Sequence, residues 1–275
     1  MKKQTIKKGM IACVAVLFLA VWLFPYLYLI SSSLKPSAEV ISIPARFLPT
    51  VLSTENFSAL FERLPVFAYI GNSFFCAAVS TVIAVILGSL SAYAIARTGA
   101  RLSAVLVVLV LCLKMIPTSS IAVPIYEIII KFGLYDTKTA LIIVYAAINM
   151  PFVMWTMLSF YEGIPLALDE AACIDGASSF QTFYKVILPI CKPGLTTAAI
   201  FTMLLAWNDF LLSLLLTSLN AKTFTVGLSE FLSAYSLDLG PMCAGAFLFS
   251  FPVMILSIAA QKYIVQGQTA GAVKG

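Results

Sequence analysis

The sequence predicts an all-α integral membrane protein with six transmembrane helices. The first observation is its composition: 61% of the 275 residues are hydrophobic, 11% are charged and the mean hydropathy is +1.01. Soluble domains average about 45–50% apolar and about 25% charged residues. The second is a set of six long apolar runs, because a helix needs about 20 apolar residues to cross a bilayer. No stretch is left for a soluble domain of ordinary size, so an energy-supplying enzyme would be another chain.

The six runs predict spans at residues 10–30, 70–96, 102–123, 140–160, 195–216 and 242–263. The first run follows four lysines like a signal peptide. It is too long for one, however, and no small-residue cleavage site follows it, so we expect a retained span. The predicted organisation is a cytoplasmic N-terminus, a first span, an external loop, a five-helix core domain and a cytoplasmic tail, at residues 1–9, 10–30, 31–69, 70–264 and 265–275. Within the external loop, Ser53–Arg63 is a candidate short helix with Thr54 as its N-cap, ended by Pro65.

Charge predicts the orientation. With the N-terminus inside, ten lysines and arginines fall on the inner side and six on the outer side, while Lys114 lies within a span. Because inner loops carry the excess of positive charge, we expect both termini to be cytoplasmic. The polar insert at residues 161–194 is then cytoplasmic as well, although its own charge is mostly acidic.

This insert predicts two short helices around a glycine. Leu166–Asp175 is a good helix former, and Gly176 follows where a left-handed C′ residue would end the helix. Ser178 and Gln181 have the spacing of a capping box at the start of a second helix.

The second helix is predicted to carry one apolar face, formed by Phe180, Phe183, Tyr184 and Ile187 at i, i+3, i+4 and i+7. We expect Pro189 to stop it, and Pro193 with Gly194 to turn the chain back into the membrane. An amphipathic pair lying on lipid is one interpretation, but such helices are usually basic and this insert is acidic in its first half. An amphipathic helix docked in a groove of a protein partner fits better.

Several classes of chemistry are disfavoured. The chain has no histidine, which removes the commonest general base and metal ligand. Its six cysteines show no CxxC pair and lie mostly in apolar runs, so they are expected to pack as small apolar residues. We therefore expect no metal and no cofactor. The net charge of +5 fits basic cytoplasmic ends and requires no nucleic-acid partner.

The insert resembles the cytoplasmic signature of binding-protein-dependent ABC transporter permeases. The matching residues are Glu170-Ala171-Ala172, Gly176 and Val186-Ile187-Leu188-Pro189, with Val186 in place of the family's isoleucine. Further residues resemble the carbohydrate branch of the family: Ser33-Leu34-Lys35-Pro36, Thr54–Phe57, Asn72-Ser73, Pro117 with Pro124, Asp136-Thr137 and Trp207-Asn208. The tail Gly267–Gly275 is similar to the six-span subunit of maltose type.

The resemblance implies a type I importer permease in a bacterial plasma membrane, with residues 161–194 as the coupling-helix loop. Its implied partners are a second permease, a cytoplasmic ABC ATPase homodimer and an extracytoplasmic solute-binding protein. Its implied substrate is a sugar such as a di- or oligosaccharide. The implied ATPase-coupling residues are Glu170, Ala171, Ala172, Asp175, Gly176, Phe180, Leu188 and Pro189. The chain has no GxxxxGK[ST] motif, so ATP would be bound and hydrolysed by a partner and this subunit would not be an enzyme.

Polar residues inside spans are candidates for a translocation pathway, because charges there are costly. The candidates are Lys114, Pro117, Asn149, Trp207, Asn208 and Asp209. Each has an ordinary structural alternative. Lys114 can extend to the interface or pair, and Pro117, with Pro124, can break or kink its helix as prolines commonly do in membrane helices. The others can hold helices together by hydrogen bonds.

Two other function classes compete. A self-contained secondary transporter or channel for a small polar solute would predict inverted repeats and helices broken at the midplane, and neither is evident in the sequence. A membrane enzyme would need a cluster of catalytic polar residues, which a chain without histidine and with few intramembrane carboxylates disfavours.

Overall fold

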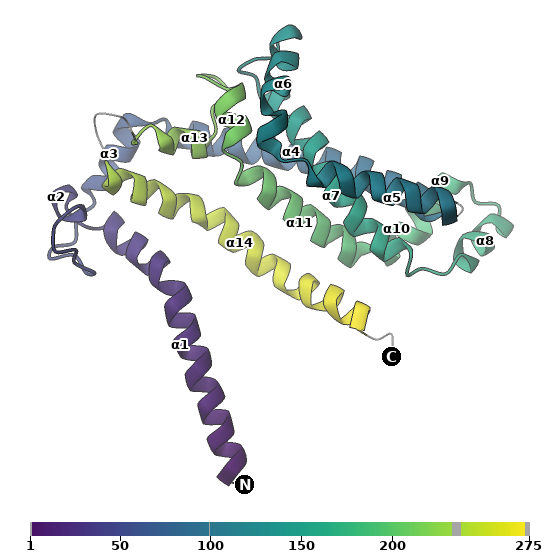
Figure 1. The fold of residues 1–275 in the computed structure, drawn as a ribbon, viewed down its shortest axis with the longest axis horizontal. Helices are drawn as coiled ribbons and strands as arrows, with labels where there is room; N and C mark the ends of the chain where they lie inside the picture. Colours follow the sequence, from purple (N-terminus) through teal and green to yellow (C-terminus); the bar gives the residue numbers. More distant parts are fainter. Residues whose placement is uncertain (1, 99, 233–237, 273–275) are drawn as a thin grey trace. The chain divides into compact units, whose positions relative to one another are not determined.

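The computed structural model describes residues 2–98, 100–232 and 238–272, and all regular elements within them are helices (Figure 1). They are α1 (Lys2–Ser33), α2 (Ser37–Val40), α3 (Glu55–Arg63), α4 (Val66–Ala96), α5 (Ala100–Met115), α6 (Thr118–Lys131), α7 (Lys138–Tyr161), α8 (Ala167–Ile174), α9 (Ser179–Thr182), the π-helix η1 (Phe183–Ile187), α10 (Leu188–Ile190), α11 (Lys192–Trp207), α12 (Leu211–Leu216), α13 (Phe224–Ser229) and α14 (Leu239–Ala272). The chain forms two compact units, one of Met1–Val66 and Gly227–Phe251, the other of Phe67–Val226 and Pro252–Gly275.

The predicted all-α membrane fold is confirmed. Four described helical segments are long and apolar enough to cross a membrane: Met10–Ser33, Val66–Ala96, Lys138–Tyr161 and Leu239–Ala259. The number rises to six if each of two sharply bent helix pairs counts as one span. The last helix continues through most of the predicted tail to Ala272, and residues 273–275 of that tail lie outside the described residues.

The third apolar run, predicted as a span over residues 102–123, is not one continuous helix. It forms two helices, α5 and α6, that meet at an angle of 88°. The residue before a proline avoids the helical conformation, so α5 ends at Met115 and Pro117 becomes the N-cap of α6. The second helix then runs through Pro124 to Lys131, eight residues beyond the predicted end.

The fifth apolar run is also interrupted. α11 ends at Trp207 and α12 begins at Leu211, so the run predicted as a span over residues 195–216 is not one continuous helix. Asp209 lies in the break, where its Oδ2 accepts hydrogen bonds from Tyr145 Oη at 2.8 Å and from the backbone N–H of Ser213 at 3.0 Å. The carboxylate thus satisfies a donor in the first turn of α12 that has no intrahelical partner.

The core of the second unit is built around α4, α7 and α11. Small residues let the helices approach: a Cβ added at Gly88 of α4 would lie 2.9 Å from the Cβ of Val153 in α7. A Cβ at Gly194 of α11 would lie 2.6 Å from the ring of Phe160. Such contacts are typical of helix packing in membranes, where close backbone approach replaces the hydrophobic driving force.

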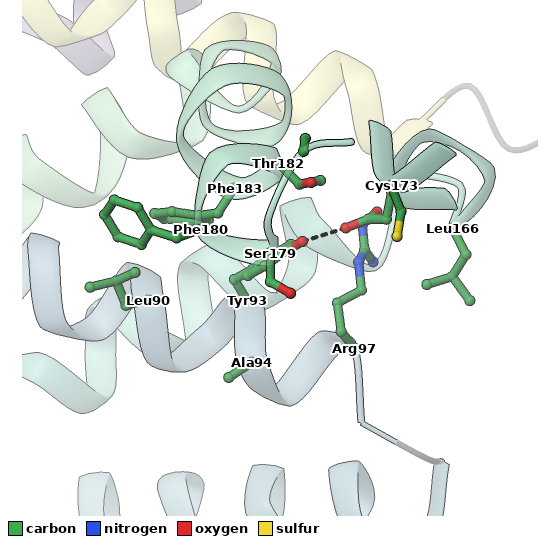
Figure 2. Close-up of a pocket in the computed structure, with 12 residues that line it drawn as sticks. Leu90, Tyr93, Ala94, Arg97, Leu166, Cys173, Ser179, Phe180, Thr182 and Phe183 are labelled. Carbon is green, nitrogen blue, oxygen red and sulfur yellow. Dashed lines mark hydrogen bonds and ion pairs between the residues drawn. The ribbon is translucent and has the colours of Figure 1, made fainter. Parts of the chain in front are cut away.

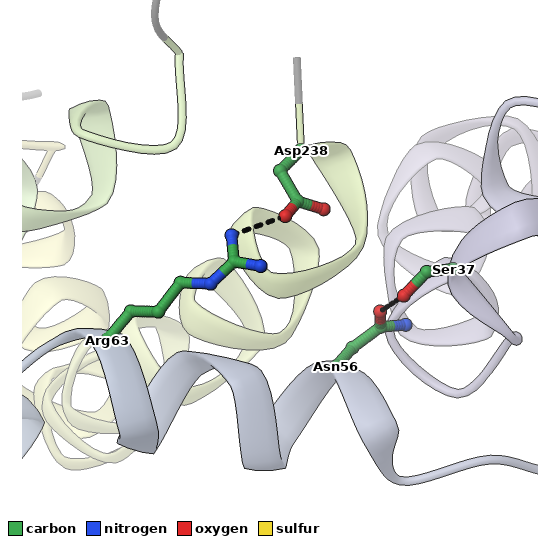
Figure 3. A network of polar contacts seen from close by, with 4 residues as sticks. All are labelled: Ser37, Asn56, Arg63 and Asp238. Carbon is green, nitrogen blue, oxygen red and sulfur yellow. Dashed lines mark hydrogen bonds and ion pairs between the residues drawn. The ribbon is translucent and has the colours of Figure 1, made fainter. Parts of the chain in front are cut away.

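In the first unit, Asn56 organises the segment between α1 and α3 (Figure 3). Its side-chain Nδ2 donates to the carbonyl oxygens of Ser33 at 3.2 Å and Lys35 at 2.7 Å, and its Oδ1 accepts from Ser37 Oγ at 2.9 Å. The side chain is fully buried. Buried amides are stable when their hydrogen bonds are satisfied, so Asn56 fixes the chain as it leaves α1.

The short helix predicted at residues 53–63 is α3. Thr54 occupies its N-cap position without a side-chain capping bond, and the helix ends at Arg63, before Leu64 and Pro65. At its end, Arg63 Nη1 pairs with Asp238 at 2.6 Å (Figure 3). This pair is exposed to solvent and adds little to stability.

Asp136 holds a loop of the second unit in place. Its carboxylate accepts hydrogen bonds from four consecutive backbone N–H groups, those of Ser218, Leu219, Asn220 and Ala221, at distances of 2.9 to 3.2 Å. Burial alone would raise the pKa of Asp136, but these backbone donors outweigh it and lower the pKa to about 2. Asn72 supports the same loop by donating to the carbonyl oxygens of Asn220 at 3.2 Å and Lys222 at 3.0 Å.

We expect Asp136→Asn to lower the melting temperature of the detergent-solubilised protein, because hydrogen bonds to a charged group contribute about 1.5–3 kcal/mol. The folded-state pKa lies below the unfolded value of about 3.9, so this stabilisation is complete above pH about 4 and is lost as the pH falls towards about 2. Thermal unfolding of both proteins from pH 7 to pH 2 measures it. Equal melting temperatures for both proteins at pH 7 would contradict the prediction.

Candidate functional site

The polar insert forms an ordered structure at the end of the second unit opposite α6 and α12 (Figure 1). Its first half is α8, which carries Asp169 and Glu170 in the first turn, where acidic residues complement the helix dipole. Gly176 has φ of +82°, and its N–H bonds to the carbonyl of Cys173 at 3.0 Å. The N–H of Ala177 bonds to the carbonyl of Ala172 at 2.9 Å. These two bonds are the Schellman motif, so the predicted glycine stop is confirmed.

The second half starts with the predicted capping box. Ser178 Oγ accepts from the N–H of Gln181 at 3.3 Å, and Gln181 Oε1 accepts from the N–H of Ser178 at 2.9 Å. α9 then continues directly into the π-helix η1, whose wider turn changes the register of the side chains.

The single apolar face predicted for the second half is wrong. Phe183 and Ile187 are buried in the core with Met157, whereas Phe180 and Tyr184 are 67% and 62% exposed. The π-helix separates the four residues, which an unbroken α-helix would have aligned. One pair anchors the insert and the other pair is free to meet a partner.

The predicted turn residues also need correction. Pro189 does not stop the helix but lies in the first turn of α10, where its missing N–H is not needed. The chain turns at Cys191, where the segment Ser179–Ile190 and α11 meet at 83°. Pro193 and Gly194 are already inside α11.

The base of the insert carries a polar contact that the sequence analysis missed. The carboxylate of Asp169 in α8 pairs with the guanidinium of Arg97 at 2.8 Å and accepts a short hydrogen bond from Tyr93 Oη of α4. Figure 2 shows Tyr93 of α4 and Arg97, which directly follows α4, pointing towards the insert. In the sequence, Arg97 was only one of the ten inner basic residues and Asp169 only part of the acidic charge of the insert. Nothing in the sequence indicates that Asp169 meets Tyr93, 76 positions before it, or Arg97.

Aromatic rings lie beneath this contact. The ring of Phe183 in η1 lies 5.0 Å from that of Tyr93 and 6.3 Å from that of Tyr161. Tyr161 Oη is 2.5 Å from Ser89 Oγ of α4. Offset and edge-to-face pairs of this kind add to the stability gained from burial, so η1 is firmly seated against α4 and α7.

A groove of about 540 Å³ opens between α4 and the insert (Figure 2). Its lining residues are Leu90, Tyr93, Ala94, Arg97, Leu166, Asp169, Cys173, Ala177, Ser179, Phe180, Thr182 and Phe183. It joins the exposed aromatic side of the insert to the charged residues at its base.

Most of the predicted coupling residues are exposed on the insert. The exposed ones are Glu170, Ala171, Asp175, Gly176, Phe180 and Pro189, while Leu188 is partly buried and Ala172 is buried. Ile174, which was not predicted, is the most exposed large apolar residue of α8 at 86%. An acidic helix with exposed apolar side chains suits a protein partner better than bulk water.

Five of the six candidate pathway residues lie at two places. Lys114 and Pro117 are at the α5–α6 bend, where Lys114 borders a cavity of about 300 Å³ and its Nζ lies 5.8 Å from the ring of Phe152. Asn208 and Asp209 are at the α11–α12 break, next to the buried Trp207. In the part of the chain that the structure describes, Lys114 and Asp209 form no ion pair.

Asn149 is buried in α7. Among residues 2–98, 100–232 and 238–272, no group of three or more cysteine, aspartate or glutamate side chains is arranged to hold a metal. The six cysteines are free thiols.

Taken together, the apolar helices, the two breaks and the ordered polar insert describe a multi-span membrane protein with an ordered polar segment between its apolar helices. Residues 84–269 match the family described as the binding-protein-dependent transport system inner membrane component. The chain belongs to this family. It is therefore a multi-pass plasma-membrane transport subunit and not itself an enzyme.

Among its relatives is the trehalose transport system permease protein SugB of Mycobacterium tuberculosis, which is 36% identical over 92% of this chain and 93% of its own length. The trehalose/maltose transport system permease protein MalG of Thermococcus litoralis is 32% identical over the full length of both. A crystal structure of a bacterial ABC transporter that imports the acidic polysaccharide alginate shares the fold, with a TM-score of 0.77 at 22% identity over 96% of this chain and 98% of the solved one.

A break or kink at Pro117 was expected from the proline, whereas the break at Asp209 was not evident in the sequence, where the lack of clearly broken helices was used against a secondary transporter. Because the structure contains both breaks, the family match, and not the continuity of the helices, separates this chain from a secondary transporter.

Proposed function

We propose that this chain is one permease half of an ATP-driven importer of a sugar, most simply a di- or oligosaccharide. The observation that carries the proposal is an ordered, acidic insert with exposed apolar side chains in a member of this family. Relatives whose names specify trehalose and maltose support a sugar substrate.

The proposed partners are a second permease, an ABC ATPase homodimer and an external solute-binding protein. A related fold was solved in complex with a periplasmic protein bound to an alginate pentasaccharide, at 16% identity and a TM-score of 0.67. Both termini, residues 1–9 and 265–275, and the insert 161–194 are proposed to face the cytoplasm, with the loop 31–69 outside. The inner excess of positive charge supports this orientation.

The proposed coupling residues are the exposed ones on the insert. Glu170 offers a carboxylate for a polar contact, and Phe180 offers a ring that a groove can enclose. Gly176 sets the angle between the two halves. Helix-in-groove docking uses apolar anchors of this kind, with charged neighbours that fix orientation.

Purification of the tagged chain from its natural membrane in mild detergent tests this function. We expect a second multi-span permease and a P-loop ATPase to copurify. Vesicles that also receive the binding protein should take up radiolabelled trehalose or maltose only with internal ATP. A chain that purifies alone and transports without ATP would instead be a secondary transporter.

We propose that the α5–α6 bend lines the translocation pathway. The ammonium of Lys114 can donate three hydrogen bonds, and the sugar hydroxyls can accept them. Loss of a charged hydrogen-bond donor costs about 1.5–3 kcal/mol, so Lys114→Met should raise the KM of uptake about tenfold. Lys131→Met, at the exposed end of α6, is the matched control and should leave KM unchanged. If Lys114→Met and Lys131→Met have the same KM, Lys114 does not contact the sugar in the translocation pathway.

A further inference from the structure

The two halves of the insert are attached to the membrane helices in different ways. The second half is seated by two large buried side chains, Phe183 and Ile187. In α8 the single buried residue is Ala172, whose side chain is one methyl group. Apolar burial stabilises in proportion to area, so packing alone holds α8 weakly.

Polar contacts provide the attachment of α8 to the membrane helices that apolar packing does not provide. Tyr93, Arg97 and Asp169, here called the clasp, join α4 to the first turn of α8. Arg97 also donates from Nη1 to the carbonyl of Tyr161 at the end of α7, at 3.3 Å, and its guanidinium carbon lies 5.4 Å from the ring centre of Tyr93. One guanidinium therefore connects three helices.

The clasp is shielded from water, with side-chain exposures of 15% for Arg97 and 18% for Asp169. The strength of an ion pair rises as solvent is excluded, and removing one partner leaves the other charge uncompensated. The clasp also combines the charge pair with a hydroxyl hydrogen bond and a cation–π contact, which together define one geometry.

We propose that the clasp is the positioning element that makes α8 and the cytoplasmic end of α4 move as one rigid body. This rests on the proposed function: a movement of the ATPase is transmitted through the insert to the membrane helices only if α8 keeps its orientation relative to α4. Arg97, Asp169 and Tyr93 are positioning residues, since they act through the exposed surface of α8.

The first measurement needs no partner protein. Nitroxide labels are attached to keto-amino acids at positions 87 and 174, both exposed, in place of Leu87 of α4 and Ile174 of α8, so that the native cysteines stay. Pulsed electron paramagnetic resonance on the purified chain should give one narrow distribution of distances between the two nitroxides. We expect Arg97→Gln and Asp169→Asn to broaden the distance distribution, and Tyr93→Phe to broaden it less. The double exchange of Arg97→Asp with Asp169→Arg should make the distribution narrow again. Lys185→Gln, an exposed charge on the same insert, is the matched control.

The second measurement uses the complete transporter in vesicles. The wild-type distance should stay the same between the nucleotide-free and vanadate-trapped states. Arg97→Gln should keep the ATPase bound but reduce the sugar transported per ATP hydrolysed by about fivefold or more, the lower range of allosteric coupling. Arg97→Lys, which keeps the positive charge, should give a ratio of transport to hydrolysis between those of Arg97→Gln and the wild type. A purely structural role of Arg97 would not require this partial recovery.

Two results would contradict the proposed role of the clasp. One is a distance distribution as narrow in Arg97→Gln as in the wild type, and the other is an unchanged ratio of transport to hydrolysis in Arg97→Gln. Should the charge variants fail to fold, Tyr93→Phe, which removes one hydroxyl, decides the first point. A wild-type chain that recruits no ATPase would contradict the proposed function, whereas the distance measurement on the chain alone would still test the clasp.

Discussion

Gly176→Leu should reduce ATP-driven uptake about tenfold while the spans remain inserted and the protein remains folded. Gly176 has φ of +82°, a conformation that costs an L-residue with a side chain about 1–2 kcal/mol. A Cβ there would meet nothing within 4 Å, so the cost is backbone strain and not a clash. The chain can relieve this strain only by opening the Schellman motif that ends α8. That change would alter the angle between the two halves of the insert, and a coupling free energy of about 1–3 kcal/mol corresponds to losses of this size.

Gly133 provides a matched control. It also has a positive φ, of +67°, with nothing within 4 Å of an added Cβ, but it follows α6 and lies outside the insert. Gly133→Leu carries the same local strain and should leave uptake within about twofold. Gly176→Asn should retain most activity, since asparagine tolerates the left-handed region. Uptake and copurified ATPase are measured for all three variants; equal losses in both leucine variants would show that strain anywhere, and not the insert, is responsible.

Gly88→Ala should destabilise the protein, whereas Gly71→Ala should not, although both change the same residue type within α4. The added Cβ at Gly88 would lie 2.9 Å from two carbons of Val153 and 3.2 Å from the carbonyl oxygen of Met150. At Gly71 nothing lies within 4 Å. Overpacking costs typically about 1–3 kcal/mol. Alanine in a helix is otherwise about 0.5–1 kcal/mol more favourable than glycine.

Thermal unfolding of both variants in the same detergent measures the difference. We expect the melting temperature to fall for Gly88→Ala and to stay or rise slightly for Gly71→Ala. Gly88→Leu should leave little folded protein, because α4 and α7 would be forced apart along the centre of the second unit. A Gly88→Ala protein as stable as the wild type would mean that the two helices do not pack in this register.

The sequence by itself determined the features that depend on local backbone chemistry. The apolar runs placed the main membrane helices, since length and hydropathy suffice to predict a span. The end of α8 at Gly176 and the capping box of Ser178 were predictable because a left-handed residue and a capping side chain act within one turn. The exposure of the Glu170 carboxylate was also expected from the polar character of the insert.

Only the tertiary structure decided how these elements bend and meet. The proline at position 117 was visible, but whether it kinks a span or turns it by 88° depends on the helices packed around it. The π-helix that buries Phe183 and exposes Phe180 arises where the insert seats against α4 and α7. The clasp joins residues 76 positions apart, and Asp136 holds a loop 84 positions away. Contacts at such separations depend on the path of the whole chain, which no local pattern of residues encodes.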